Sequence, residues 1–196
     1  EVSGSIQGDP NRKLSTRPQM EKDEWQKFCE KISELGKYLE DEGMPLAYHH
    51  HMGTVIETQK DTERLIENTH ESVKLTLDTG HMLFAKGDSK YILQNYHERI
   101  LHVHCKDIRK QVLEKSLKED LSFRGAFLEG AFTVPGDGCI DYQPLFNVLK
   151  NNNYSGWLVV EAEQDPAKAN PLEYAKIGYK YLTDTLKKSE IEIYKN

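Results

Sequence analysis

Apolar residues recur along the chain in two patterns that alternate with each other. Spacings of three and four residues predict helices over residues 20–42, 61–68, 88–96, 142–151 and 171–187. Short continuous apolar runs predict strands over residues 46–49, 73–77, 100–104 and 157–160. An alternation of strand and helix with short connections is typical of βαβ units and indicates a parallel sheet.

The helix over residues 20–42 shows the helical pattern on a single apolar stripe, made by Trp25, Phe28, Ile32, Leu35 and Leu39. Residues 1–19 before it are expected to be the end of a strand followed by a polar loop. The segment from Lys106 to Asp141 does not follow the alternation and is expected to be a long insertion. Loops of that length in compact domains usually serve a function.

Length and composition fit one domain. The chain has 196 residues, which is short for a complete eight-stranded α/β barrel of about 250 residues. Apolar residues make up 37% of the chain, less than the roughly 45–50% of an average globular protein. Part of the chain must therefore form solvated surface.

The charge pattern and the lengths of the apolar runs argue against two classes of partner, nucleic acids and membranes. The net charge is −6, and acidic and basic residues are mixed without a block of Lys and Arg, so no nucleic-acid surface is indicated. No apolar run approaches the roughly 18 residues of a membrane span. The three cysteines, Cys29, Cys105 and Cys139, are widely spaced, which favours free thiols in a reducing, cytoplasmic compartment.

Polar residues that can bind a metal follow every predicted strand. They are His49, His50 and His51, then Asp78 and His81, then His104, Lys106 and Asp107, and finally Glu161 and Glu163. In α/β barrels the active site forms at the carboxyl ends of the strands, so these side chains are expected to converge. Histidine together with carboxylate suits a divalent ion such as Mn²⁺, Co²⁺ or Zn²⁺, which could polarise a carbonyl group while a nearby side chain moves a proton.

Each of these residues also has an ordinary structural interpretation. His104 alone could be a hydrogen-bonded core histidine, and Asp78 before Thr79 could cap a helix or form a turn. Lys106 could form an ion pair with its neighbour Asp107. Glu163 could lie near a metal site without binding the metal itself. Because such residues follow every predicted strand, a shared metal site is favoured over a separate structural role for each residue.

Several of these segments resemble the inosose dehydratases of inositol catabolism, which belong to the xylose-isomerase-like barrel superfamily. The segments are AYHHHMGT at 47–54, LDTGH at 77–81, HVHCKD at 102–107, TVPGDGCID at 133–141 and WLVVEAEQDP at 157–166. The resemblance covers nearly the whole chain, and LDTGH by itself marks only the superfamily. It implies a lyase that dehydrates 2-keto-myo-inositol (scyllo-inosose) to 3D-trihydroxycyclohexane-1,2-dione, with Mn²⁺ or Co²⁺ and with glutathione as a further cofactor to test.

The resemblance also implies a set of metal ligands. Asp78, His104 and Glu161 match the Asp, His and Glu ligands of the superfamily. The fourth ligand of the superfamily is usually a Glu at the end of the preceding strand, where this sequence has histidines instead. His49 directly follows the strand and is the first choice, with His51 as the second.

Proton transfer and substrate binding are assigned to the remaining strand-end residues. His81, Glu163 and Lys106 are the candidates for general acid and base, and the sequence does not rank them. His51 and Asp107 are the candidates for substrate binding. The expected substrate is a small polyol ketone.

The family pattern puts Glu1 at the end of about the fourth barrel strand. The fold class expected is therefore α/β, the C-terminal half to two-thirds of a (β/α)₈ TIM barrel, with residues 1–196 as one domain that lacks its N-terminal strands. Such a chain would expose sheet edges, so a truncated form is expected to pair with a second copy as a homo-oligomer or to fold loosely.

Three other functions compete with the dehydratase. A sugar isomerase or epimerase of the same superfamily would share the barrel and the metal, but its product would keep the water. An abasic-site endonuclease would need a basic surface, which the net charge of −6 argues against. A noncatalytic sugar-binding or metal-storage module would bind without turnover, so an activity assay separates it from an enzyme.

Overall fold

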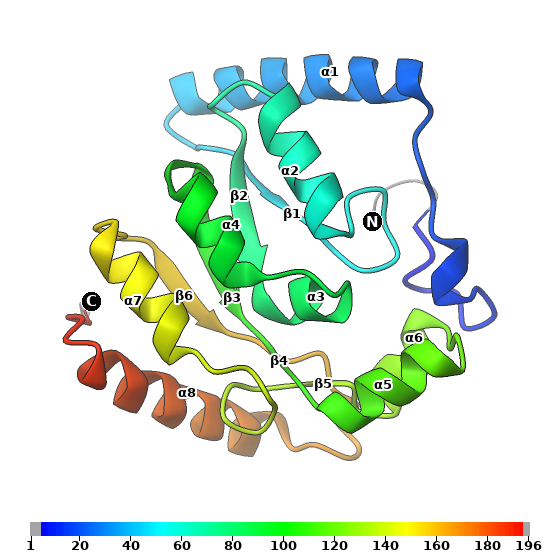
Figure 1. The fold of residues 1–196 in the computed structure, drawn as a ribbon, viewed down its shortest axis with the longest axis vertical. Helices are drawn as coiled ribbons and strands as arrows, with labels where there is room; N and C mark the ends of the chain where they lie inside the picture. The colour runs from blue at the N-terminus through cyan, green and yellow to red at the C-terminus, as the bar shows by residue number, and fades with distance from the viewer. Residues whose placement is uncertain (1–4, 194–196) are drawn as a thin grey trace.

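The computed structural model describes residues 5–193 and contains a parallel sheet at its centre (Figure 1). Four strands lie in the order β1-β2-β3-β6, and each neighbouring pair is parallel. The strands are β1 (Ala47–His49), β2 (Lys74–Asp78), β3 (Ile100–Cys105) and β6 (Trp157–Val160). The predicted α/β class and all of the strands predicted from residue 46 onward are confirmed.

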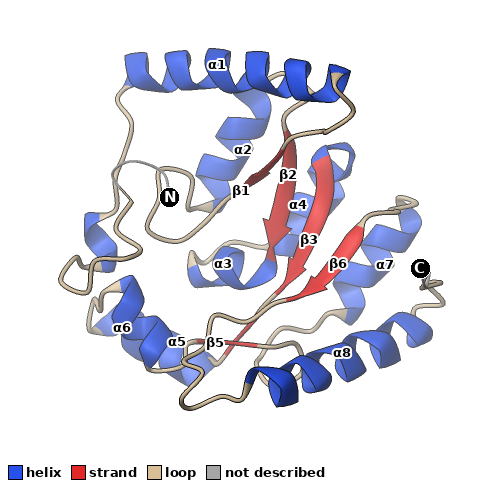
Figure 2. Cartoon of the chain, turned by 180° about the vertical axis from the view of Figure 1, so that it is seen from behind, coloured by secondary structure: helices blue, strands red, loops and turns tan. Residues whose placement is uncertain are grey.

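Helices that were predicted from apolar spacing precede, connect or follow these strands. They are α1 (Lys22–Asp41), α2 (Gln59–Asn68), α4 (Ser89–Tyr96), α7 (Gln143–Asn151) and α8 (Pro171–Lys188). Side chains fix the first turns of several of them: Thr58 and Asp61 form a capping box for α2, and Asp88 and Asn170 cap α4 and α8. Helices α4 and α7 cover one face of the sheet, which lies in front of them in Figure 2.

The two faces of the sheet differ in polarity because side chains alternate along a strand. On the helix-covered face, Leu75, Leu77, Val103 and Cys105 are buried in the main hydrophobic core with residues of α4, α7 and α8. The residues between them point to the other face: Thr76, Asp78, His102 and His104. The sheet therefore presents its polar side chains on the face opposite to these helices.

The segment from Lys106 to Asp141 is not the long loop that was expected. It contains β4 (Asp107–Ile108), α5 (Lys110–Lys118), α6 (Phe123–Leu128) and β5 (Phe132–Thr133), with β4 and β5 paired antiparallel. Leu113, Phe123 and Phe132 are buried in a second core with Phe84 of α3 (Thr79–Phe84), a helix that the sequence reading also missed. These helices are short, so few apolar residues fall on each stripe and the helical pattern is weak.

Residues 1–4, where the end of a strand was expected, lie outside the described part. Residues 5–19 hold a polar loop, as expected, and one turn of 3₁₀ helix, η1 (Leu14–Thr16). A second 3₁₀ turn, η2 (His97–Arg99), leads into β3. The apolar stripe of α1 is only partly buried, because Trp25 is 5% exposed whereas Leu35 is 47% exposed.

Strand β6 lies at an edge of the sheet and is less buried than a central parallel strand. Trp157 is 66% exposed, and Leu158, Val159 and Val160 are only partly buried. An apolar groove of about 480 Å³, which we call the β6 groove, runs between this edge and α8, and its lining includes Trp157, Leu158, Tyr179, Leu182 and Ile193. In the described residues this apolar run is therefore not covered on both faces, as the central strands of a parallel sheet are.

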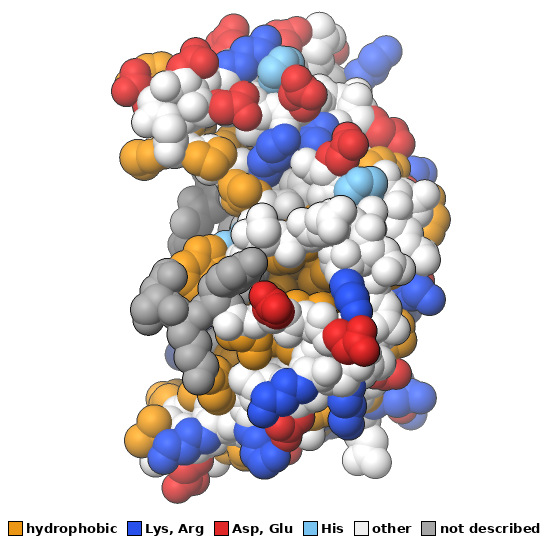
Figure 3. Space-filling model, turned by 90° about the vertical axis from the view of Figure 1, so that its left-hand side faces the viewer, with side chains coloured by type: hydrophobic (Ala, Val, Ile, Leu, Met, Phe, Trp, Pro, Cys, Tyr) orange, Lys and Arg blue, Asp and Glu red, His pale blue; other side chains and the backbone are white. Residues whose placement is uncertain are grey.

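Charged side chains are spread over the surface in both signs. On the side of the molecule drawn in Figure 3, Lys and Arg side chains alternate with Asp and Glu and form no single basic patch. This agrees with the mixed charge pattern of the sequence. Among residues 5–193, none of the helices combines the length and the apolar character that crossing a bilayer requires.

Candidate metal centre

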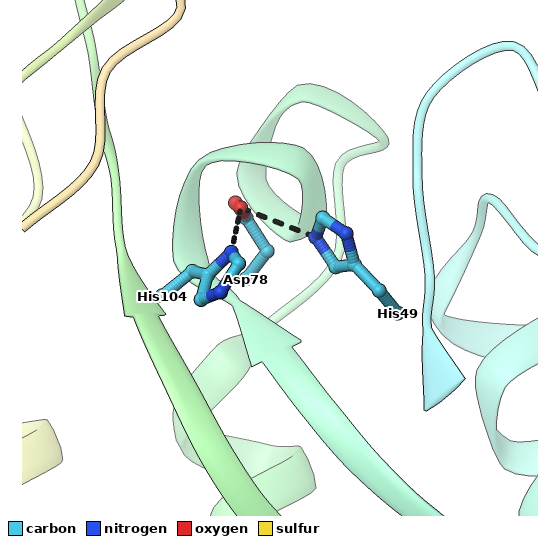
Figure 4. Close-up of side chains that lie close together, drawn as sticks. All are labelled: His49, Asp78 and His104. Atoms are coloured by element: carbon cyan, nitrogen blue, oxygen red, sulfur yellow. Dashed lines mark ion pairs between the residues drawn. The ribbon is translucent and has the colours of Figure 1, made fainter. Parts of the chain in front are cut away.

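The four residues proposed as metal ligands lie side by side at the carboxyl ends of the strands. His49 is the last residue of β1, Asp78 is the last of β2, His104 lies near the end of β3, and Glu161 directly follows β6. Asp78 and His104 are direct partners in the register of the two central strands. Figure 4 shows the rings of His49 and His104 on either side of the Asp78 carboxylate.

Four polar atoms of these residues converge without hydrogen bonding to anything in the described part of the chain. Oδ2 of Asp78 is 3.4 Å from Nε2 of His49 and 3.6 Å from Nδ1 of His104, which is 2.5 Å from Oε2 of Glu161. All four atoms are buried, and none has a partner with hydrogen-bond alignment. Unpaired buried polar atoms are rare and costly, so nitrogen and carboxylate donors aimed at one point fit a divalent ion.

Glu161 joins this group less tightly than the other three. The ligand atoms of His49, Asp78 and His104 all lie within 4.8 Å of one another, whereas Glu161 contacts the set through His104. Its side chain is 29% exposed and that of Asp78 is fully buried. His49, Asp78 and His104 thus form a compact group, and Glu161 lies beside it on the side that is more exposed to solvent.

The electric field of this group favours a cation. The carboxylates of Asp78 and Glu161, which lie 3.6 and 2.5 Å from Nδ1 of His104, raise the pKa of His104 to about 9, against the effect of burial. Burial by itself would raise the pKa of Asp78, but the charge that His81 carries at low pH and the charge of Lys106 hold it well below its ordinary value. Two carboxylates therefore stabilise positive charge at the point where a metal ion would lie.

Asp78 uses its two oxygens for different purposes. Oδ1 accepts a hydrogen bond of 2.8 Å from the backbone N–H of His81 and so caps the first turn of α3. Oδ2 is left facing His49 and His104. The structural interpretation of Asp78 as a helix cap and the functional interpretation as a ligand are both supported, one by each oxygen.

His50 is a buried residue of the site, and the sequence did not predict its role. Its Nε2 accepts a hydrogen bond of 3.1 Å from the backbone N–H of Asp78, and burial lowers its pKa to about 3. It is therefore neutral and fixes the backbone at the end of β2. Its place between His49 and His51 was visible in the sequence, but the alternation of side chains could not say what it contacts.

A second group lies directly beside the first and contains all three proposed acid–base residues. Nζ of Lys106 is 2.9 Å from Nε2 of His81, 3.0 Å from Oε2 of Glu163 and 3.1 Å from Oδ2 of Asp78. His51 completes the group, with Nε2 3.6 Å from Oε1 of Glu163. The structure therefore brings His81, Glu163, Lys106 and His51 together at the same end of the sheet.

Burial and charge fix the protonation of this second group. Burial lowers the pKa of His81 to about 4, so its ring is neutral at pH 7. Burial would raise the pKa of Glu163, but contacts with His51 and His81 and the charge of Lys106 hold it far below its ordinary value. Burial would lower the pKa of Lys106, yet the surrounding carboxylates raise it above its ordinary value. Lys106 is thus an ammonium ion and Glu163 a carboxylate.

Lys106 is held in place by residues of the DTGH motif and by Tyr142, which directly precedes α7. The hydroxyl of Thr79 donates to the carbonyl oxygen of Lys106 at 2.7 Å, and Tyr142 donates to the same oxygen at 3.0 Å. A Cβ atom at Gly80 would lie 2.8 Å from Cγ of Lys106, so only glycine leaves room for the lysine stem. Thr79 was quoted in the motif without a role, and nothing in the sequence pointed to Tyr142.

Asp107 is not brought to the site, which corrects its assignment as a substrate-binding residue. Its buried carboxylate accepts hydrogen bonds from the backbone N–H groups of Ile108, Gly136, Cys139 and Ile140. It thereby organises the VPGDGCID loop. The alternative pairing of Lys106 with Asp107 is also wrong, because the ion pairs of Lys106 in the described residues are with Asp78, Glu161 and Glu163.

The fold and the site together define a β/α protein of barrel type with a candidate divalent-metal centre at its strand ends. The chain belongs to the xylose isomerase-like TIM barrel family, which matches residues 4–185. It is 47% identical over 186 residues to the inosose dehydratase of Clostridium beijerinckii, covering 94% of this chain and 62% of that protein. It is 46% identical over 169 residues to the rhizopine catabolism protein MocC of Rhizobium meliloti, covering 86% and 52%.

Solved structures agree with this fold. The IolI protein crystallised with a zinc atom has a TM-score of 0.66 and 21% identity, over 89% of this chain and 60% of that chain. The TM-score for the probable 3-DHS dehydratase AsbF of Bacillus anthracis is 0.65, with 18% identity, over 87% and 59%. At these identities the likeness is one of fold. The chain spans about 62% of the length of the inosose dehydratase from Clostridium beijerinckii.

Proposed function

We propose that this chain carries the metal-binding part of an inosose dehydratase, a lyase that removes water from 2-keto-myo-inositol (scyllo-inosose). The product would be 3D-trihydroxycyclohexane-1,2-dione. The observation that carries the proposal is the convergence of four buried ligand atoms, from His49, Asp78, His104 and Glu161, that form no aligned hydrogen bond. The 47% identity to a protein named inosose dehydratase supports the choice of substrate.

The ion in this proposal is Mn²⁺ or Co²⁺, both of which suit a mixed set of imidazole and carboxylate ligands. His49 is proposed as the fourth ligand in preference to His51, because His49 faces Asp78 while His51 lies against Glu163. When bound, the ion would supply Lewis acidity that polarises the ketone and makes the neighbouring C–H bond more acidic.

The proton transfers are assigned to the group around Lys106. The α-carbon loses its proton to a base, the electrons of the broken C–H bond form a C=C bond, and the β-hydroxyl leaves with a proton as water. The resulting enol tautomerises to the second ketone of the dione. The neutral ring of His81 can accept the proton and return it to the leaving hydroxyl, while the Glu163 carboxylate at 3.2 Å and the Lys106 ammonium group at 2.9 Å stabilise the charges that form.

Substrate would approach this group from its accessible side. Lys106 and His81 are fully buried, whereas the side chain of His51 is 16% exposed and that of Glu163 is 27% exposed. The ring of Phe123 packs 5.3 Å from that of His51 and leaves an apolar wall beside the polar group. His51 is therefore the residue best placed to contact hydroxyl groups of the substrate.

A turnover assay tests the proposal. The chain is incubated with 2-keto-myo-inositol and Mn²⁺ or Co²⁺, with and without glutathione, and the products are analysed by mass spectrometry. We expect a product lighter by one water, formed only with the metal and lost on chelation. The inosose dehydratase of Clostridium beijerinckii is the positive control. A product of unchanged mass would support a sugar isomerase or epimerase, and unchanged substrate beside a working control would contradict catalysis by this chain.

The proposal includes pairing with a second copy of the chain. Strands β1 and β6 lie at the edges of the described sheet, and a second copy could cover them. The apolar β6 groove, with Trp157 66% exposed, provides the contact surface. Sedimentation equilibrium is expected to give a dimer, and Trp157→Lys is expected to weaken it. A monomer with a sharp cooperative melt would contradict the pairing.

The proposal also keeps the protein in a reducing, cytoplasmic compartment. Its three cysteines form no disulfide: Cys29 and Cys105 are buried, and Cys139 is exposed. Burial raises the pKa of Cys105 well above that of an ordinary thiol, so it is unreactive.

A further inference from the structure

The residues His51, His81 and Glu163, which we call the second cluster, have the composition of a metal site themselves. One atom from each lies within 4.8 Å of the others. Nε2 of His81 is 3.2 Å from Oε2 of Glu163, and Nε2 of His51 is 3.6 Å from Oε1. The second cluster therefore offers two imidazole nitrogens and a carboxylate beside the candidate metal centre.

A positive charge of the protein already occupies this position. The ammonium group of Lys106 lies 2.9 Å from Nε2 of His81 and 3.0 Å from Oε2 of Glu163. It also lies 3.1 Å from Asp78 and 3.2 Å from Glu161, so it bridges the second cluster and the first ligand set. Lys106 is fully buried, and the absence of a side chain at Gly80 lets its stem pass.

The charges of the two groups determine how many ions they can hold. Asp78, Glu161 and Glu163 are three carboxylates, and Lys106 is the ammonium group among them. Two negative charges are left over, which one divalent ion neutralises. Buried charges must be balanced closely because the low dielectric of the interior makes excess charge of either sign costly.

We propose that the second cluster is a cation subsite whose resident cation is the ammonium group of Lys106, so that the chain binds one divalent ion and not two. This inference rests on the proposed function, in which the first ligand set holds that ion. Lys106 then supplies a second, permanent positive charge that acts at short range beside the metal ion, from a fully buried position. An ammonium group is a compact charge with three donors, which suits oxygen-rich ligands.

The number of bound metal ions tests the inference. Each protein is titrated with Mn²⁺, and tightly bound Mn²⁺ is counted by elemental analysis and by electron paramagnetic resonance. We expect one ion in the parent chain and two in Lys106→Met, with magnetic coupling between them, because paired metals lie about 3.5–4 Å apart. Adding His81→Asn to Lys106→Met is expected to return the count to one.

Controls separate this inference from the function on which it rests. Lys115→Met removes a lysine that pairs with Glu129 at the surface and is expected to keep one ion. Lys106→Gln, which retains a hydrogen-bond donor, is measured beside Lys106→Met, and circular dichroism verifies that both are folded. The parent chain is also titrated at a hundredfold higher concentration of Mn²⁺, which tests for a second ion without any substitution.

The ion counts distinguish failure of this inference from failure of the proposed function. One ion in both Lys106 variants, or two in the parent chain, would overturn the inference while leaving the first ligand set intact. No ion in the parent chain would overturn the first ligand set, and with it both the proposed function and this inference. Two uncoupled ions in Lys106→Met would place the second ion elsewhere and would also overturn the inference.

Discussion

Asp78→Asn is expected to lose tight binding of Mn²⁺ and, with it, turnover of the polyol ketone. The substitution removes the charge of Oδ2, the buried oxygen that faces both His49 and His104. Replacing groups that only orient metal ligands already costs about 10- to 100-fold in affinity, so loss of a charged ligand should exceed 100-fold. Calorimetric titration measures the affinity, and the turnover assay measures the activity.

The fold of this variant should survive, because asparagine caps helices about as well as aspartate. The side-chain oxygen of Asn can still accept the hydrogen bond that Asp78 receives from the N–H of His81. Asp88→Asn is the matched control, since Asp88 caps α4 in the same way at an exposed position. The control should bind Mn²⁺ normally. Equal binding by both variants would mean that Asp78 is a structural cap and not a ligand.

Lys106→Met is expected to lower the free energy of unfolding of the metal-free chain by about 3–5 kcal/mol, the usual cost of leaving buried charges without their partner. Asp78 and Lys106 are both fully buried, and Glu161 and Glu163 also face the ammonium group. Methionine preserves most of the apolar stem, so lost packing contributes little. Urea denaturation in the presence of a chelator measures the change.

Lys115→Met is the control for this experiment as well. Lys115 pairs with Glu129 at 2.7 Å, but both side chains are exposed to solvent, where ion pairs contribute little. Its denaturation midpoint should match that of the parent chain. A Lys106 variant as stable as the control would show that the carboxylates around Lys106 are solvated, and not balanced by its charge.

The sequence predicted the convergence of His49, Asp78, His104 and Glu161 because these residues end or follow buried strands. Asp78 and His104 end apolar runs, and parallel strands bring such ends to one edge of a sheet. The pattern predicts the position of a side chain along a strand, but not its partners in space. This is why His50 and Tyr142 were missed, although each makes a hydrogen bond that positions the site.

Lys106 and Asp107 illustrate what the sequence could not determine. Adjacent residues of an extended segment point in opposite directions, so only one of the two could face the site. Lys106 turns to Asp78 and Glu163, and Asp107 turns to the backbone of the loop that contains Gly136. The choice depends on the loop at 133–141, which is distant in sequence, and no local pattern contains that information.

The edge strand β6 shows the same limit for the fold. Its apolar run correctly predicted a strand, but the exposure of Trp157 depends on which strand lies beside it. Neighbours in a sheet are set by topology, whereas periodicity reports only the strand itself. For the same reason Leu35 belongs to a clear apolar stripe and is still 47% exposed.

The proposed ligands belong to all four strands of the sheet, including its two outer ones. His49 comes from β1 and Glu161 follows β6, and these strands are not hydrogen-bonded to each other. Outer strands usually open first in local unfolding, which exposes their amides to exchange with solvent. An ion held by both residues would have to be released before either strand could separate. Ion binding should therefore slow amide exchange at both edges together and make the sheet open as one cooperative unit.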